Sequence, residues 1–172
     1  MPIEIHPYNR GWPKRYLRLA RDIDSALGPG AHRVEHIGST AIPGLAAKDI
    51  IDIQVSVAAF EPEANYREPL ERIGYTYRAD AANPDHRFFK QDGPTGRRLV
   101  NLHVCEVGSA WERRHLLFRN LLRSNPRASK QYELLKVRLS AMYEDVLSYT
   151  DAKSAFIEEI LAASPPTHTE SS

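Results

Sequence analysis

The sequence has a single cysteine, Cys105, among its 172 residues. One thiol excludes both a disulfide framework and a zinc site built from several cysteines. No run approaches the ~20 consecutive apolar residues of a membrane span. The N-terminal stretch M-P-I-E-I-H-P-Y also lacks the basic and apolar segments of a signal peptide. We therefore expect a protein of the cytoplasm with no membrane partner.

Charge of one sign is not in excess either. The chain has 23 Lys and Arg residues against 22 Asp and Glu residues, for a formal net charge of +1. Such a balance creates no strong field for nucleic acid or an anionic membrane. The basic residues form no stripe with interleaved aromatic side chains, so we expect no nucleic-acid partner. A small molecule and a nucleotide are the expected partners, and the oligomeric state stays open.

Hydrophobic residues make up 42% of the chain, which is enough for one domain with a core. Their periodicity predicts helices over 12–27, 62–73, 109–123, 126–146 and 151–162, and strands over 32–37, 50–57, 75–78, 86–91 and 97–106.

The order of these elements predicts an α/β (α+β) fold. We expect a mixed β-sheet with helices on one face, followed by a C-terminal helical part. A single domain is expected over 1–163, with its core at 1–108 and its last helices at 109–163. The tail at 164–172 has nothing to bury and is expected to be disordered.

A Gly-Ser pair followed by an Asp-bearing strand is the main functional signal. Gly38 allows backbone N–H groups to approach a phosphate closely, and Ser39 adds a hydroxyl. Asp52 and Gln54 share the polar face of the next strand, where oxygen ligands would hold Mg²⁺. Gln54 stands where a two-metal site needs a second carboxylate. The pattern alone therefore leaves two interpretations open, a metal-dependent phosphate site and a polar loop between two strands.

The run V-E-H-I-G-S-T-A-I-P-G-L-A-A-K-D-I-I-D-I-Q-V resembles the signature of the GrpB (UPF0157) family. Three later stretches match the family in order: R-L-V-N-L-H-V-C-E-V-G-S-A-W, L-L-F-R-N-L-L-R-S-N-P and Y-T-D-A-K-S-A-F-I. The resemblance implies a nucleotidyltransferase-type fold related to polymerase β. It places Gly38 and Ser39 at the Gly-Ser motif of that superfamily and Asp52 at the first position of its Asp-x-Asp pair. Gln54 departs from the second position.

Two histidines are candidates for the same cleft. His103 lies on the polar face of its strand and would face Asp52 if the two strands pair, as a metal ligand or a general acid or base. The alternative interpretation is that His103 is a buried histidine whose ring nitrogens form hydrogen bonds within the protein. His36 shares a strand face with Gly38, so we expect His36 rather than Glu35 to face the cleft. The alternative for His36 is an ordinary polar residue at a strand end.

Arg98 and Lys153 are the candidates for binding phosphate. The resemblance favours Arg98 over Arg87 and Lys90. Without the resemblance, we would interpret all three as charges on a solvated face of the sheet. Lys153 is expected near the start of the last helix, where the helix dipole disfavours a cation. A bound phosphate or the neighbourhood of Asp52 would compensate, and a simple exposed lysine is the alternative.

Together these residues predict an enzyme that transfers a nucleotidyl or phosphoryl group from Mg²⁺-bound NTP to a small molecule. Asp52, Gln54 and His103 would hold the Mg²⁺, and Asp52, His103 and His36 would be catalytic. Gln54 favours an alternative, a nucleotide- or ligand-binding module that has lost the chemistry. A third possibility is an acyl or aminoacyl transferase with His36 and His103 as bases.

Overall fold

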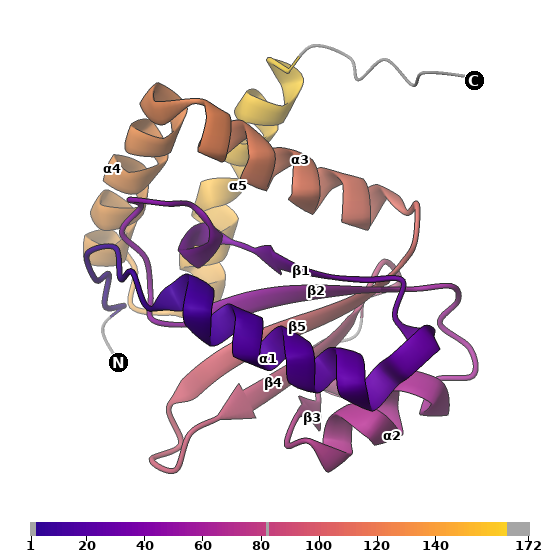
Figure 1. The fold of residues 1–172 in the computed structure, drawn as a ribbon. Coiled ribbons are helices and arrows are strands. Elements are labelled where there is room, and N and C mark those ends of the chain that lie inside the picture. Colours follow the sequence, from indigo (N-terminus) through magenta and orange to yellow (C-terminus); the bar gives the residue numbers. More distant parts are fainter. Residues whose placement is uncertain (1–2, 82, 165–172) are drawn as a thin grey trace.

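A five-stranded β-sheet forms the centre of the computed structural model, which describes residues 3–81 and 83–164 (Figure 1). The strand order is β1-β2-β5-β4-β3. Strands β2 and β5 are parallel, and the other neighbouring pairs are antiparallel, which confirms the predicted mixed sheet. The strands are β1 (Arg33–Ile37), β2 (Ile51–Val57), β3 (Thr76–Tyr77), β4 (Arg87–Asp92) and β5 (Arg98–Glu106).

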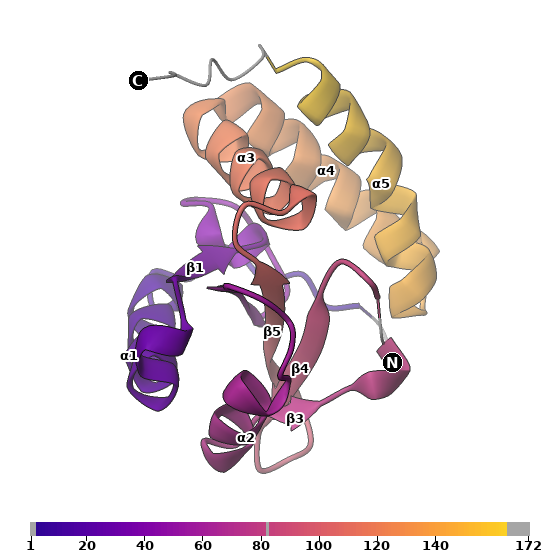
Figure 2. The same cartoon turned by 90° about the vertical axis from the view of Figure 1, so that its right-hand side faces the viewer.

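The helices divide between the two sides of this sheet (Figure 2). One side carries α1 (Trp12–Leu27) and α2 (Ala64–Arg72). The three C-terminal helices lie on the other side and contact β1 and β5 through α3. They are α3 (Ala110–Ser124), α4 (Pro126–Met142) and α5 (Val146–Ala162).

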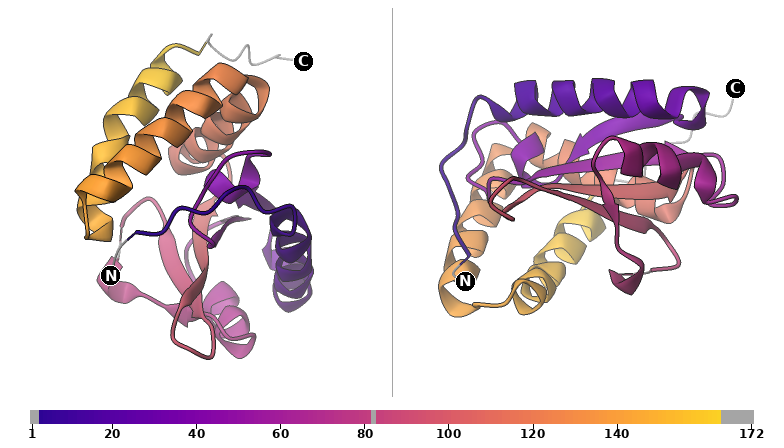
Figure 3. Two further views of the ribbon diagram at one scale, coloured as in Figure 1. Left: turned by 90° about the vertical axis from the view of Figure 1, so that its left-hand side faces the viewer. Right: turned by 90° about the horizontal axis from the view of Figure 1, so that it is seen from below.

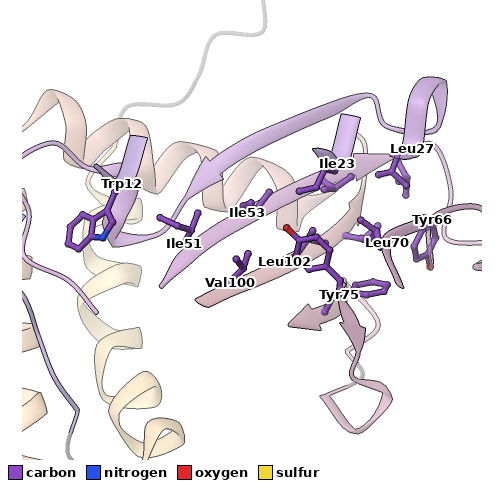
Figure 4. Close-up of a cluster of buried hydrophobic side chains, with 14 of the residues drawn as sticks. Trp12, Ile23, Leu27, Ile51, Ile53, Tyr66, Leu70, Tyr75, Val100 and Leu102 are labelled. Atoms are coloured by element: carbon purple, nitrogen blue, oxygen red, sulfur yellow. The ribbon is translucent and has the colours of Figure 1, made fainter. Parts of the chain in front are cut away.

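Alternation along β2 and β5 sends apolar side chains toward α1 and α2 (Figure 4). Ile51 and Ile53 of β2 and Leu102 of β5 are fully buried there, beside Ile23 and Leu70 of the two helices. Each such side chain stabilises the fold by roughly 1.5–3 kcal/mol. The polar residues of the same strands are thereby turned toward the C-terminal helices.

The N-terminal segment links the two sides of the molecule. It runs from α1 to the C-terminal helices, where Ile3 packs with Leu139 of α4 and Tyr149 of α5 (Figure 3). Between these points His6 forms an antiparallel bridge with Ala47. The helical part is therefore anchored to the sheet by the start of the chain as well as by α3.

The boundary between the last two helices differs from the prediction. Helix α5 begins at Val146 instead of residue 151, because the carboxylate of Asp145 accepts the Ser148 N–H at 2.8 Å and caps it. Val146 and Leu147 are exposed, so apolar periodicity could not reveal this first turn. Lys153 consequently lies well inside α5, and the argument that the helix dipole disfavours it there was wrong.

Other boundaries agree with the sequence more closely. Helix α1 spans the predicted residues, and the five strands begin and end within two residues of their predicted limits. The predicted tail lies outside the described residues, apart from Ser164. Across 3–81 and 83–164, no helix is long and apolar enough to cross a membrane.

Candidate functional site

A cavity of about 350 Å³ lies between the polar face of the sheet and the C-terminal helices. This volume falls at the lower end of the range for small-molecule sites. Segments far apart in sequence build its walls: the turn after β1, the polar faces of β2 and β5, and one face each of α3, α4 and α5. The lining residues used below are Gly38, Ser39, Lys48, Asp52, Asn101, His103, Trp111, His115, Tyr132, Lys136, Tyr149 and Lys153.

The turn after β1 is built around Gly38. Its backbone has φ 71° and ψ −173°, a conformation that is essentially restricted to glycine. A Cβ atom at this position would lie 2.5 Å from Oδ2 of Asp52. The Asp52 carboxylate therefore rests directly against the Gly38 backbone, and Ser39 begins a short 3₁₀ turn beside it. This is the physical reason for a glycine at the Gly-Ser motif in this chain.

Asp52 is held from the other side by Asn101, its partner in the parallel register of β2 and β5. The Asn101 amide donates to Asp52 Oδ1 at 3.0 Å and accepts from Arg98 Nη1 at 2.9 Å. Arg98 Nε also donates to Asp92 at 2.9 Å. Arg98 is not among the residues that line the cavity, and it reaches the site through Asn101, so its binding of a phosphate stays a prediction.

Three lysines from different elements converge on this carboxylate. Lys48 comes from the loop before β2, Lys136 from α4 and Lys153 from α5, and we call them the lysine wall. In the part of the chain that the structure describes, the lining of the cavity contains one carboxylate, that of Asp52, against these three cations. The site therefore carries an excess of positive charge, which favours an anionic ligand.

Two tyrosines support the lysine wall. Lys153 Nζ lies 4.4 Å and Lys48 Nζ 5.1 Å from the centre of the Tyr149 ring. Lys136 Nζ lies 5.2 Å from the Tyr132 ring centre and donates to the Ala46 carbonyl. Cation–π contacts hold the ammonium groups in place without neutralising their charge.

Burial shifts the titration of these groups. Desolvation lowers the pKa of Lys136 to about 7 and that of Lys153 to about 8, and neighbouring lysines add to both shifts. The pKa of Lys48 is also lowered, again mainly by desolvation. Desolvation raises the pKa of Asp52, against the Asn101 hydrogen bond and the lysine charges, which lower it. An arriving anion would relieve the repulsion among the lysines.

Of the three side chains predicted to hold Mg²⁺, those of Asp52 and His103 line the cavity and that of Gln54 does not. Gln54 is fully buried, and neither of its amide atoms has a hydrogen-bond partner among the described residues. His103 lines the cavity, but its register partner is Gln54, and the neighbour of Asp52 is Asn101. Within the described ranges, no three His, Cys, Asp or Glu side chains are grouped so that they could hold a metal ion. One carboxylate among three lysines is a poor donor set for Mg²⁺.

His36 lies on the wrong face of β1 for its predicted role. It pairs with Ile53, stacks on Tyr16 of α1 at 4.6 Å between ring centres, and is 5% exposed. Its Nε2 lies 2.9 Å from the Thr40 hydroxyl, and burial lowers its pKa to about 3. The prediction that His36 faces the cleft was wrong. Ile37, which pairs with Asp52, lines the cavity instead.

Two arginines of α3 fix the position of the Gly-Ser turn. Arg119 Nη1 donates to Glu35 at 2.6 Å and to the His36 carbonyl at 3.0 Å. Arg123 Nε donates to the Ala41 carbonyl at 2.9 Å. These contacts hold the loop between β1 and β2 against the helical part.

Sequence reasoning missed most of the lysine wall. One signal was available for Lys136, which follows Tyr132 by four residues and precedes Leu139 by three, inside an otherwise apolar stripe of α4. A lysine in such a stripe is either paired or placed for a ligand. Lys48 gave no such signal, because its position depends on how the loop from 42 to 50 folds over the sheet.

Gln54→Met tests whether the buried amide at this position stabilises the fold. Because both amide atoms are buried without partners, we expect the free energy of unfolding to stay the same or rise by about 1–2 kcal/mol. Chemical denaturation monitored by fluorescence would measure this change. A loss of more than about 1 kcal/mol would show that Gln54 makes a stabilising contact that its unpartnered amide does not predict.

Comparison with known proteins identifies relatives along most of the chain. The family model described as GrpB protein matches residues 2–163. A UPF0157 protein of Halalkalibacterium halodurans is 41% identical over 163 residues, covering 92% of this chain and 80% of its own length.

Solved structures extend this comparison to the fold. The crystal structure of the conserved protein GrpB from Enterococcus faecalis has a TM-score of 0.81 and 34% identity, covering 91% of this chain and 94% of that chain. Cid1 poly(U) polymerase with MgGTP bound has a TM-score of 0.55 and 16% identity, covering 77% of this chain and 43% of the polymerase. At that identity the similarity concerns the fold alone, and it confirms the predicted nucleotidyltransferase-type architecture.

Proposed function

The chain belongs to the GrpB (UPF0157) family, and we propose that it binds a nucleoside triphosphate or a related phosphate ester through its lysine wall, without requiring a metal ion. The observation that carries this proposal is the convergence of Lys48, Lys136 and Lys153 on a cavity with a single carboxylate. In this account the lysines neutralise the phosphates, a task that Mg²⁺ would otherwise perform.

The turn at Gly38 and Ser39 supports a phosphate in the same place. Backbone N–H groups and a hydroxyl at such a turn are suited to bind phosphate oxygens. The fold similarity to Cid1 poly(U) polymerase, whose structure holds MgGTP, supports a nucleotide as the first ligand to test. The acceptor of any transfer reaction is not part of the proposal.

A thermal-shift screen tests the proposal directly. ATP, GTP, CTP, UTP and tripolyphosphate would each be added in EDTA and, separately, in Mg²⁺. A ligand at 100 times its Kd that binds only the folded protein adds about 2.7 kcal/mol to stability. We expect at least one nucleotide to raise the melting temperature in EDTA. The absence of a shift with every ligand in EDTA would contradict the proposal, and shifts that appear only in Mg²⁺ would favour a metal-dependent site.

A second candidate is the transferase that uses Mg²⁺-bound NTP, and one observation favours it. The Asp52 carboxylate sits against the Gly-Ser turn, where a metal between protein and phosphates would be bound. The remaining ligands would have to come from water and from the phosphates themselves. In that case Asp52 is indispensable, whereas in metal-free binding it is dispensable and acts only through the charges of the lysines and the phosphates.

Asp52→Asn separates the two candidates, because asparagine keeps the shape and removes the charge. For metal-free binding we expect the affinity for ATP in EDTA to stay within about tenfold of the wild type, because the carboxylate repels the phosphates but also favours the charged form of the lysines. Isothermal titration calorimetry would measure the affinity in EDTA and in Mg²⁺. A loss of Mg²⁺-dependent affinity or turnover, with the melting temperature retained, would instead support the transferase.

A further inference from the structure

The wall of the cavity formed by β5 and α3 differs in chemistry from the lysine wall. It consists of His103 of β5 with Trp111 and His115 of α3, and we call these three residues the neutral wall. The Trp111 indole stacks on His115, with ring centres 4.0 Å apart, and on His86, with ring centres 3.8 Å apart. Its orientation is therefore fixed from two sides.

Burial keeps the imidazoles of this wall uncharged. Desolvation lowers the pKa of His103 well below its ordinary value and also lowers that of His115. The His86 and His115 charges would oppose protonation of His103 further. The charge of Arg114 lowers the pKa of His115 further, whereas the hydrogen bond to the Trp111 carbonyl raises it. A neutral imidazole offers one donor and one acceptor.

The hydrogen bonds within the wall leave polar groups without protein partners. His115 Nδ1 lies 2.8 Å from the Trp111 carbonyl oxygen. Because a carbonyl only accepts, this nitrogen carries the proton, and Nε2 of the neutral ring is left as an acceptor. Among residues 3–81 and 83–164, His103 Nδ1 and Trp111 Nε1 are buried and have no hydrogen-bond partner. These two atoms have almost no surface open to the cavity, so the acceptor that the neutral wall offers a ligand is Nε2 of His115, beside aromatic surface and without charge.

We propose that the neutral wall receives the uncharged heteroaromatic part of the ligand, a nucleobase, while the lysine wall holds its phosphates. A purely apolar group would leave the Nε2 acceptor of His115 unpaired, which is costly for a buried group. A second phosphate would find no cation at the neutral wall. This inference rests on the proposed function and specifies its ligand as a nucleotide rather than a free polyphosphate.

The test compares ATP with tripolyphosphate, which has the phosphates and lacks the base. His115→Phe keeps a flat ring to stack on Trp111 and removes the Nε2 acceptor. We expect this variant to bind ATP about 3- to 10-fold more weakly and tripolyphosphate as well as the wild type does, as measured by calorimetry in EDTA. His115→Gln, which retains an amide acceptor, should recover part of the lost affinity.

Each outcome of this test is decisive. If wild-type protein binds tripolyphosphate as tightly as ATP, or if His115→Phe weakens both ligands equally or neither of them, the inference is wrong and the lysine wall alone binds the ligand. If neither ligand binds the wild type, the proposed function fails together with the inference. A melting temperature within a few degrees of the wild type is the control for an intact fold.

Discussion

Gly38→Ala is expected to lower the affinity for ATP at least tenfold and the free energy of unfolding by about 2–5 kcal/mol. The added Cβ would lie 2.5 Å from Asp52 Oδ2 and 2.9 Å from Asp52 Cβ, so the strand or the turn must shift. Because the turn also carries Ser39 at the edge of the cavity, this shift displaces the groups that face the phosphates. Calorimetry in EDTA and chemical denaturation measure the two effects.

Gly44→Ala is the matched control for this variant. Gly44 lies in the same loop and also has a positive φ, 80°, but a Cβ there would meet no heavy atom within 4 Å. We expect a loss of about 1 kcal/mol from backbone strain and an unchanged affinity. Equal effects of the two substitutions would show that loop strain, and not contact with Asp52, explains the glycine at 38.

Lys153→Met is expected to lower the affinity for ATP by about 10- to 100-fold, the range for a lost hydrogen bond to a charged group. Methionine keeps most of the apolar stem over Tyr149 and removes the ammonium. The control is Lys130→Met on α4, because Lys130 is exposed and pairs with Glu133 at 2.6 Å. An unchanged affinity of Lys153→Met, or an equal loss in both variants, would remove Lys153 from the site.

The same lysines predict how affinity depends on pH. The pKa of Lys136 is about 7 and that of Lys153 about 8, so the two groups lose charge between about pH 6 and 9. Affinity for ATP should fall over this window, and Lys153→Met should lack the upper part of the fall. The stability of the ligand-free protein should change in the opposite direction. Because these lysines titrate near 10.5 when unfolded, the unfolded chain holds more protons, and stability rises with pH above about 7.

The sequence predicted the framework of the site because local rules govern it. Alternation along β2 put Asp52 on the face opposite Ile51 and Ile53, and the parallel neighbour β5 brought Asn101 and His103 to the same side. The Gly-Ser pair fell at the end of β1 because a chain that turns against a carboxylate requires glycine there. These relations depend on residues close in sequence or on strand register.

What the sequence did not predict depends on how the C-terminal helices lie on the sheet. Alternation shows that Asp52 and Gln54 share a face, but it does not show that the protein buries Gln54 outside the cavity. Alternation also shows that the side chains of β1 point to two faces, but it does not show which face the C-terminal helices cover. His36 was assigned to that face, whereas it lies on the face toward α1. Lys136 reaches the site only because α4 turns its buried stripe toward the cavity.

The measurement that tests the central claim is a calorimetric titration of wild-type protein with ATP in EDTA, repeated in Mg²⁺. If the lysine wall neutralises the phosphates, ATP binds in EDTA, and Mg²⁺ changes the affinity less than tenfold. Absence of binding in EDTA, together with binding in Mg²⁺ that Asp52→Asn abolishes, would contradict this account. It would establish Asp52 as the centre of a metal site.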